Sequence, residues 1–509
     1  MAGLTGPLLG DPAAATSALC LPLMTTTKFD RRSALRLGAM SLAAAASGTL
    51  RAQAPDAVAL APHLADVDGD GVIGLGDAGV MQQAVLTSRG FGIEPNSGFD
   101  MRADVFGRGV IGQDAVDAVS RAVTTTALLS QPVRRPITVG WHYGWHDHIR
   151  RPLLEQTVRY IGGDYLSNDP VVETEFNGLK NEFGITVDAL SWIPRRLTPT
   201  ILPNYQTGYF AAENAATRYV ALLYEAVLAL PTVGGRVDFH SAEVRATLVE
   251  DFTAMAQTLV QARDEYPTRV FLLDGRPVVF IFASHAFGRN PADVGEFQQM
   301  TTVVAQAREA FRGVYGEVPY LVGDELLPLA STRTPSPDRL TRGALFDAIY
   351  SYHAANLKID AAPFSLNEAY GALQRLRLER ATEATRGLKS RFTNQQVLII
   401  PSLAGGFAKH GLPSLTSTRQ AFANYLKLLI RYHEEVYLPQ EWPGALGTSA
   451  LPAPIYSVGS WNEEYEGHAV LPAQFNLALT DSEQQGFDFA MALKEAFGWN
   501  HYAERAIYP

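Results

Sequence analysis

From Pro136 onward, short runs of apolar residues alternate with longer segments in which apolar residues recur every three or four positions. Runs of the first kind are typical of buried strands, and segments of the second kind are typical of helices with one buried face. Eight strands are predicted, at residues 137–145, 185–193, 218–228, 276–284, 319–325, 346–353, 396–404 and 454–461. The clearest helices are predicted at residues 242–264, 295–312, 366–389 and 416–436.

Strands and helices therefore alternate along this part of the chain. This order favours a parallel sheet, and eight units over about 370 residues favour a (β/α)8 TIM barrel over an open doubly wound sheet. No Gly-x-Gly-x-x-Gly turn follows the first strand, which argues against a nucleotide-binding sheet. We predict that the barrel domain occupies residues 136–509.

The first 54 residues have the pattern of an export signal. Asp30-Arg31-Arg32 is followed by a mildly apolar stretch at 37–46 and by the small-x-small sequence Ala52-Gln53-Ala54. This order predicts a twin-arginine signal peptide at 1–54, cleaved after Ala54, and therefore a periplasmic or extracellular protein. The alternative interpretation is an alanine-rich amphipathic helix, and Met24 is an alternative start of translation.

A short acidic segment has the spacing of a calcium-binding loop. Such a loop takes oxygen ligands at positions 1, 3, 5, 7 and 12 and needs glycine at position 6, which Gly71 supplies. One structural Ca2+ is predicted here. Its ligands would be Asp66, Asp68, Asp70, the carbonyl of Val72, and Asp77.

A second copy of the loop, at 104–115, has lost its ligands. Phe106, Arg108 and Ala115 stand at positions 3, 5 and 12, and a cationic side chain opposes calcium, so we expect one ion and not two. With aspartate at position 12 of the first loop, the pair resembles a dockerin, which implies a small all-α EF-hand module at 60–125. Dockerins bind cohesins; the loss of the second site favours a calcium-stabilised spacer over a module with a cohesin-like partner.

Composition and charge narrow the range of partners. Hydrophobic residues make up 47% of the 509 residues and charged residues 18%, which is typical of globular proteins. The net charge of −10 argues against binding to nucleic acid or anionic membranes and is compatible with an uncharged glycan. Beyond the N-terminal segment no apolar run is long enough for a membrane span. The single cysteine, Cys20, lies in the predicted signal, so no intramolecular disulfide or thiolate zinc site is expected in the mature chain.

Aromatic and polar residues gather where the predicted strands end. In TIM barrels the chemistry takes place at the C-terminal ends of the strands. Sugars bind there by stacking on aromatic rings and by hydrogen bonding to carboxylates and amides. The substrate-binding residues predicted on this basis are Trp141, His142, Tyr143, Trp145, Trp192, Glu225, His285, Asp324, Tyr352, His353, Trp461 and Asn462.

Three motifs occur in a recognisable order: Gly163-Asp-Tyr-Leu-Ser-Asn-Asp-Pro170, Asp274-Gly-Arg-Pro-Val278 and Trp461-Asn-Glu-Glu-Tyr-Glu-Gly467. They resemble the G-x-Y-x-S-x-D-P, D-G-R-P-V and W-N-E-W-x-E-G motifs of glycoside hydrolase family 99, the endo-α-mannosidases. The resemblance spans roughly one whole barrel of this class, residues 137–475. It implies a glycosidase in which Glu463 and Glu466 are catalytic and no cofactor takes part in catalysis.

The resemblance also implies a mechanism with retention of configuration through a 1,2-anhydro sugar. Glu463 would act as the base and Glu466 as the acid/base, so the two carboxyl groups would need different pKa values. The chain departs from the family pattern at Glu464, which replaces a tryptophan, and at His142 and Gly144, which replace tyrosine and proline. These changes leave the sugar and the linkage open.

Two other functions fit the same residues. One is a non-catalytic carbohydrate-binding barrel, which would bind glycan without turnover. The other is a relative that takes part in polysaccharide biosynthesis, but the predicted export argues against it because activated sugar donors are cytoplasmic.

Overall fold

The structure is a computed structural model of the chain. It describes residues 62–67, 72–88, 105, 113–129, 136–146, 158–160, 165–290, 293–326, 337–352, 364–365, 368–404, 415–416, 419–441, 454–462, 473–475 and 488–497. The chain divides into two units, 1–57 and 58–509, and the first lies outside the described residues together with the predicted signal peptide.

All eight predicted barrel strands are present in the second unit. Each of them overlaps the range predicted for it. They are β1 (Ile137–His142), β3 (Val187–Trp192), β4 (Tyr219–Tyr224), β9 (Arg276–Ile281), β10 (Tyr320–Asp324), β11 (Ala348–Tyr350), the pair β13 (Leu398–Ile399) and β14 (Ser402–Leu403), and β16 (Ile455–Val458).

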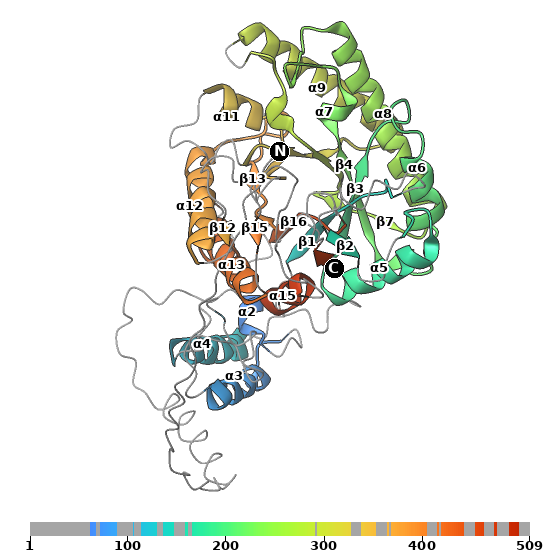
Figure 1. Cartoon of the computed structure of the whole chain (residues 1–509). Coiled ribbons are helices and arrows are strands. Elements are labelled where there is room, and N and C mark those ends of the chain that lie inside the picture. Colours follow the sequence, from blue (N-terminus) through green and yellow to red (C-terminus); the bar gives the residue numbers. More distant parts are fainter. Residues whose placement is uncertain are drawn as a thin grey trace, which may run out of the picture. The chain divides into compact units, whose positions relative to one another are not determined.

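These strands form one parallel sheet that curls round on itself (Figure 1). Its order is β13-β11-β10-β9-β4-β3-β1-β16-β14. The two end strands, β13 and β14, are parts of one stretch of chain, separated only by Ile400 and Pro401. One part pairs with β11 and the other with β16, so the two ends of the sheet meet in the seventh predicted strand, as in a TIM-like barrel.

Pro401 explains why the seventh strand is recorded in two parts. Proline has no backbone N–H and cannot donate to a neighbouring strand. Its carbonyl still accepts from Ser457 N at 2.9 Å, while Ile400 N donates to Ile349 O at 2.8 Å. The stretch therefore bonds to the sixth strand on one side and to the eighth on the other.

Several predicted strands end earlier than the apolar pattern suggested. Strand β4 ends at Tyr224, and the short helix α7 (Ala226–Ala229) begins within the range 218–228 that was predicted as strand. Strand β9 ends at Ile281, because Ala283 adopts a left-handed backbone (φ 53°) and begins the turn η5 (Ser284–Ala286). The apolar run continues past the last pairing with a neighbour, so hydrophobicity alone overestimates strand length.

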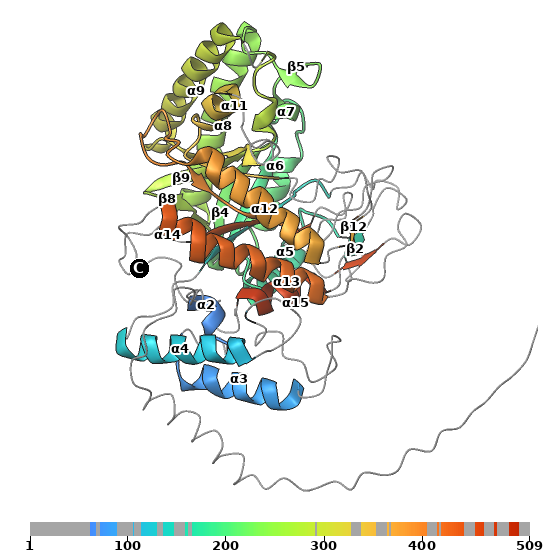
Figure 2. The same cartoon turned by 90° about the vertical axis from the view of Figure 1, so that its left-hand side faces the viewer.

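The long helices begin at residues that cap them. The side chain of Ser241 accepts from Val244 N at the start of α8 (Ala242–Glu265), and that of Asp293 accepts from Glu296 N at the start of α9 (Val294–Tyr315). Figures 1 and 2 show α8 beside α9, and α12 (Glu368–Thr385) beside α13 (Arg419–Arg431). All four correspond to predicted helices.

Shorter elements connect and flank these. The helices are α5 (Pro170–Glu182), α6 (Ile201–Asn204), η3 (Tyr205–Tyr209), η4 (Ala215–Thr217), α11 (Pro337–Gly343), η6 (Tyr432–Tyr437), α14 (Leu438–Glu441) and α15 (Asp488–Phe497). The strands are β2 (Val158–Tyr160), β5 (Thr232–Val233), β6 (Arg236–Val237), β7 (Arg269–Val270), β8 (Leu272–Leu273), β12 (Phe364–Ser365), β15 (Leu415–Thr416) and β17 (Ala473–Phe475).

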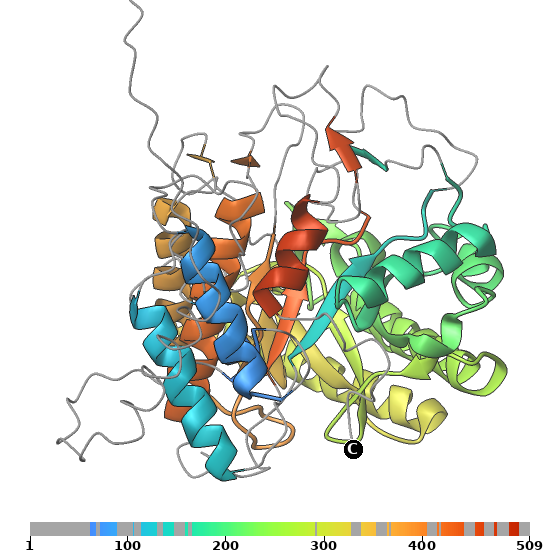
Figure 3. The same ribbon diagram turned by 90° about the horizontal axis from the view of Figure 1, so that it is seen from below.

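Burial of the barrel strands explains their continuous apolar sequences. Every residue of β1, β3 and β9 is buried. A parallel sheet has one face toward the barrel interior and the other toward the surrounding helices, which Figure 3 shows around the strands. The residues on both faces of these strands are therefore mostly apolar.

The segment predicted as a calcium module contains three helices, α2 (Pro62–Ala65), α3 (Leu75–Ser88) and α4 (Gln113–Leu129). They share a hydrophobic cluster of their own, which includes Val67, Ile73, Met81, Val105 and Val119. The assignment of this segment to an EF-hand module stays a prediction. Among the helices that the structure describes, none combines the length and apolar character needed to cross a bilayer.

His433 lies in the π-helix η6 and provides a test of core packing by pH. Burial lowers its pKa from 6.5 to about 3, and its ring lies 5.0 Å from that of Tyr437. Below pH 6.5 the unfolded chain binds a proton that the folded chain refuses, so acid destabilises the fold by about 1.4 kcal/mol per pH unit until pH 3 is approached. We expect His433→Gln to lose about 2.3 kcal/mol less stability than the parent between pH 6.5 and 4.5, because the unfolded histidine is already half protonated at pH 6.5.

Urea denaturation at pH 6.5, 5.5 and 4.5 measures this difference. The control is His240→Gln, because His240 is exposed and its hydrogen bond to Asp293 raises its pKa. The control should lose at least as much stability in acid as the parent, because a group whose pKa is raised on folding stabilises the fold as the pH falls. Equal acid sensitivity in His433→Gln and the parent would contradict the burial argument.

Candidate active site

The ends of the first and eighth strands are tied together by hydrogen bonds. Trp461 N donates to Trp141 O at 2.8 Å. The side-chain oxygen of Asn462 accepts from Tyr143 N at 2.8 Å, and its amide nitrogen donates to Tyr143 O at 3.0 Å. The same nitrogen donates to the Tyr165 hydroxyl at 3.2 Å. Asn462 is therefore fixed at the C-terminal end of the barrel, and it is buried completely.

Aromatic side chains from separate strands meet at this end. The hydroxyl groups of Tyr143 and Tyr352 are hydrogen-bonded to each other, although β1 and β11 are not neighbours in the sheet. The ring of Tyr143 stacks on Trp145 with centroids 4.2 Å apart, and Tyr352 lies 4.6 Å from Phe282. Trp145 is half-buried, whereas Tyr143 and Tyr352 are buried. Trp145 and Phe282 are thus the partly exposed members of this group.

Asp324, the last residue of β10, joins three strand ends. Its carboxylate accepts from Ala283 N at 3.1 Å and from Tyr352 N at 3.0 Å. His285 Nδ1 lies 3.5 Å from the carboxylate and 3.2 Å from the Asp324 carbonyl. Burial acts to lower the pKa of His285, but the hydrogen bond and charge of Asp324 outweigh it and raise the pKa. His285 is partly exposed, so it can present a cationic donor at the barrel end.

Glu225 follows β4 and is also buried. It accepts from the Ser191 hydroxyl at 2.8 Å. The pKa of Tyr350 is raised well above its ordinary value, first by burial and then by the charges of Asp324 and Glu225. Both carboxylates therefore act on the same interior tyrosine. The ends of β4, β10 and β11 form one electrostatic environment.

Three predicted substrate-binding residues face the outer helices. His142 Nε2 lies 3.3 Å from Glu173 Oε1, and its Nδ1 lies 3.1 Å from Lys180 Nζ, both on α5. The ring of Trp461 lies 5.7 Å from that of Phe176 on α5. Trp192 Nε1 donates to Thr258 on α8 at 3.2 Å. Successive residues of a strand point to opposite faces, so these side chains are separated from the group around Tyr143.

A cluster of buried charges that was not predicted from the sequence lies beneath α5. Asp188, the second residue of β3, accepts hydrogen bonds from Arg218 Nε at 2.8 Å and from the Tyr209 hydroxyl at 2.6 Å, and it forms an ion pair with Lys180 Nζ at 3.1 Å. All four side chains are buried. We call Glu173, Lys180, Asp188 and Arg218, with the His142 ring between Glu173 and Lys180, the α5 charge network.

The pKa values of this network reflect burial and pairing. Burial acts to raise the pKa of Asp188, but the Arg218 and Lys180 cations outweigh it and hold the pKa far below the usual range. Burial lowers the pKa of Lys180, while attraction to Asp188 opposes that change. The Lys180 ammonium also lies 5.5 Å from the ring centre of Trp461. The network therefore supports the end of the eighth strand from outside.

Some predicted residues cannot be placed. Glu463, Glu466 and His353 lie outside the described residues, as do Asp68 and Asp70 of the calcium loop. Of the other calcium ligands, Asp66 and Asp77 are buried and Val72 is exposed. The Asp77 carboxylate accepts from Gly74 N at 2.7 Å, which orders the end of the loop. The calcium ion and the catalytic roles of the two glutamates stay predictions.

The chain was compared with known protein families, curated proteins and solved structures. No protein-family model matches the chain. No curated protein matches it either.

A solved glycoside hydrolase-like protein is similar to 72% of this chain over 94% of its own length, with 14% identity and a TM-score of 0.48. The GH99 endo-α-mannosidase from Bacteroides thetaiotaomicron is similar over 72% of this chain and 98% of its own, with 17% identity and a TM-score of 0.40. A GH5-4 broad-specificity endoglucanase from Clostridium longisporum covers 72% and 97%, with 10% identity and a TM-score of 0.40. The structures that this chain is similar to are thus described as glycoside hydrolases or glycoside hydrolase-like proteins.

Proposed function

We propose that this chain is a glycoside hydrolase that cleaves a polysaccharide or oligosaccharide, with Glu463 as base and Glu466 as acid/base. The observation that carries the proposal is the fixed position of Asn462. Its side chain bonds to both the N–H and the carbonyl of Tyr143, and the next residue along the chain is Glu463. The first glutamate therefore follows directly from an anchored residue at the end where TIM-barrel enzymes carry their chemistry.

Neighbouring side chains suit a sugar ligand. Trp145 offers a half-buried ring for stacking against C–H groups. His285, whose pKa is raised by Asp324, offers a partly exposed imidazole N–H for a hydroxyl group. These groups come from the ends of different strands, as expected for a site built on a barrel scaffold.

The proposed mechanism requires one ionised and one protonated carboxyl group. Glu463 would remove the proton of the sugar 2-hydroxyl, and the oxygen would attack the anomeric carbon to form a 1,2-anhydro sugar. The bond to the leaving oxygen would break as Glu466 donates its proton to that oxygen. Glu466 would then take a proton from water, which would open the three-membered ring at the anomeric carbon, and Glu463 would return the proton to the 2-oxygen.

Location supports the same proposal. An enzyme exported by the predicted twin-arginine signal would meet glycans outside the cytoplasm, and its acidic charge would not oppose a neutral polymer. No activated sugar donor is expected there, so hydrolysis fits that location better than synthesis.

A reducing-end assay tests the function. The purified full-length protein would be incubated with α-mannan, galactomannan and mixed-linkage β-glucan, and new reducing ends would be quantified over time. We expect release from one of these neutral polymers. Binding to a polymer without any release would support the non-catalytic carbohydrate-binding barrel instead. If the protein neither releases reducing ends from these polymers nor binds them, both functions are rejected.

A further inference from the structure

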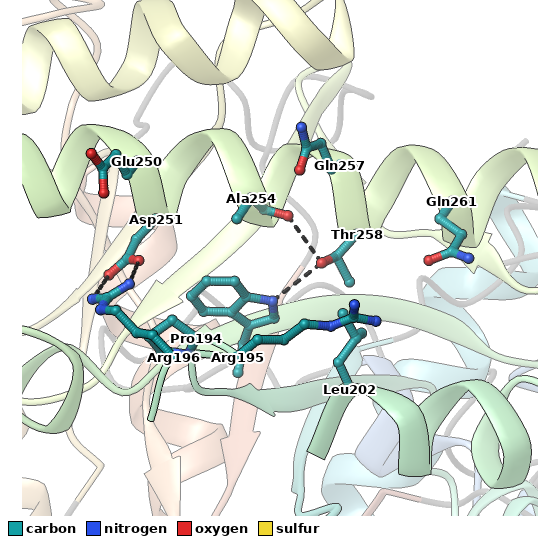
Figure 4. A pocket seen from close by; sticks show the side chains of 11 residues that line it. Pro194, Arg195, Arg196, Leu202, Glu250, Asp251, Ala254, Gln257, Thr258 and Gln261 are labelled. Carbon is teal, nitrogen blue, oxygen red and sulfur yellow. Dashed lines mark hydrogen bonds and ion pairs between the residues drawn. The ribbon is translucent and has the colours of Figure 1, made fainter. Parts of the chain in front are cut away.

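A separate pocket lies on the outer side of the barrel, between the residues that follow β3 and one face of α8 (Figure 4). Its volume is about 400 Å3. The residues from α8 that line it recur with helical spacing, and they include Asp251, Ala254 and Thr258. A volume of this size lies within the range of roughly 300–1,000 Å3 that is typical of small-molecule sites.

One wall of the pocket is apolar and rigid, with the buried Trp192 behind it. Trp192 donates through Nε1 to the Thr258 hydroxyl at 3.2 Å, and that hydroxyl donates to Ala254 O at 3.0 Å. Pro194 and Leu202 extend the apolar surface. Figure 4 shows Ala254 and Thr258 on the helix, opposite Pro194 and Leu202. The indole is thus held in one orientation before any ligand arrives.

A second wall is polar and already paired. The Arg196 guanidinium binds both oxygens of Asp251 and donates to Ala229 O at 2.9 Å. The Tyr224 hydroxyl donates to Asp251 at 2.7 Å. The hydrogen bond to Asp251 raises the pKa of Arg196. This wall is therefore preorganised, and it needs no further partner to stay ordered.

The rim supplies groups that are free to bind. Arg195, Glu250 and Gln257 are exposed, and within the described part of the chain their side chains make no hydrogen bond or ion pair. Two cations, Arg195 and Arg196, face two anions, Glu250 and Asp251, so the pocket has no net charge. This balance disfavours an anion or a cation as ligand and suits a neutral molecule with many hydroxyl groups.

We propose that this pocket is a second carbohydrate-binding site, which holds a neutral sugar unit of a polysaccharide away from the site of cleavage. Trp192 is 4% exposed, so the apolar surface for the C–H groups of a hexose comes mainly from the partly exposed Leu202 and Ala254, next to donors and acceptors of both kinds. The inference rests on the proposed function for its ligand class.

Affinity electrophoresis of the full-length protein tests the site without relying on hydrolysis. The gels would contain α-mannan, galactomannan or mixed-linkage β-glucan, with polygalacturonate as an anionic comparison. Ala254→Trp would fill the pocket, and the matched control Ala246→Trp would place the same side chain at an exposed position of α8 outside the pocket lining. We expect the pocket variant to bind a neutral polymer about tenfold more weakly than the control.

A second variant tests the site in case Ala254→Trp fails to fold. Arg195→Ala combined with Gln257→Ala removes two exposed rim groups and leaves the core unchanged, and it should also weaken retention. Equal retention of all variants and the parent, retention on polygalacturonate alone, or no retention on any gel would overturn the inference. If the parent hydrolyses a polymer but Ala254→Trp is retained as strongly as the parent, only the second site is rejected. If the parent is retained, Ala254→Trp is not, and the parent hydrolyses none of the polymers, only the proposed enzyme is rejected.

Discussion

Glu463→Gln is expected to lower kcat for polysaccharide hydrolysis by about a thousandfold, within the range that general acid–base groups contribute. Glutamine keeps the shape of the side chain but cannot take a proton from the sugar 2-hydroxyl. Because this step is needed for any leaving group, the loss should be similar on a polymer and on a 4-nitrophenyl glycoside of the same sugar.

Glu466→Gln should behave differently. The proton from Glu466 matters most when the leaving oxygen is a poor leaving group, so the variant should lose about a thousandfold on the polymer and much less in the first step on the nitrophenyl glycoside. Glu464→Gln is the matched control, since it lies between the two and has no assigned role. A full rate in Glu463→Gln, or an equal loss in Glu464→Gln, would contradict the catalytic roles of Glu463 and Glu466.

Asp188→Asn is expected to destabilise the barrel by about 3–5 kcal/mol, as is typical when one partner of a buried ion pair is removed. The variant would leave Arg218 and Lys180 buried without the charge that balances them. The free energy of unfolding at pH 7, from chemical denaturation, measures the loss.

An exposed pair provides the comparison. Arg312 and Glu309 are bound to each other on α9, and more than half of each side chain is exposed. We expect Glu309→Gln to cost less than about 1 kcal/mol, because water screens such pairs. If the two substitutions cost the same, burial would not be the source of the network's strength.

Much of the barrel follows from the sequence pattern. Strand and helix segments differ in period, and all eight strands were found near their predicted places. The strand ends were less accurate, as at 226–229, because an apolar residue after the last pairing looks like one inside the sheet. Ala283, with its left-handed backbone, gave no compositional signal of the turn.

The direction of side chains at the strand ends was harder to predict. Trp141 and His142 are both buried, yet Trp141 packs against Phe280 and Tyr350 inside the barrel while His142 contacts α5. A strand that is buried on both faces has no polar side to mark its outward positions. A signal did exist at Asp188, because a charged residue in the run Val187-Asp188-Ala189 needs a buried partner.

The bonds of Asn462 to Tyr143 join residues that are 319 positions apart. During synthesis the first strand is made long before the eighth, and until β16 emerges from the ribosome one side of β1 has no neighbour. An unpaired strand edge of this kind can pair with other chains. Closure of the barrel therefore waits for the last strand, and nascent molecules expose this edge of β1 until that strand is made.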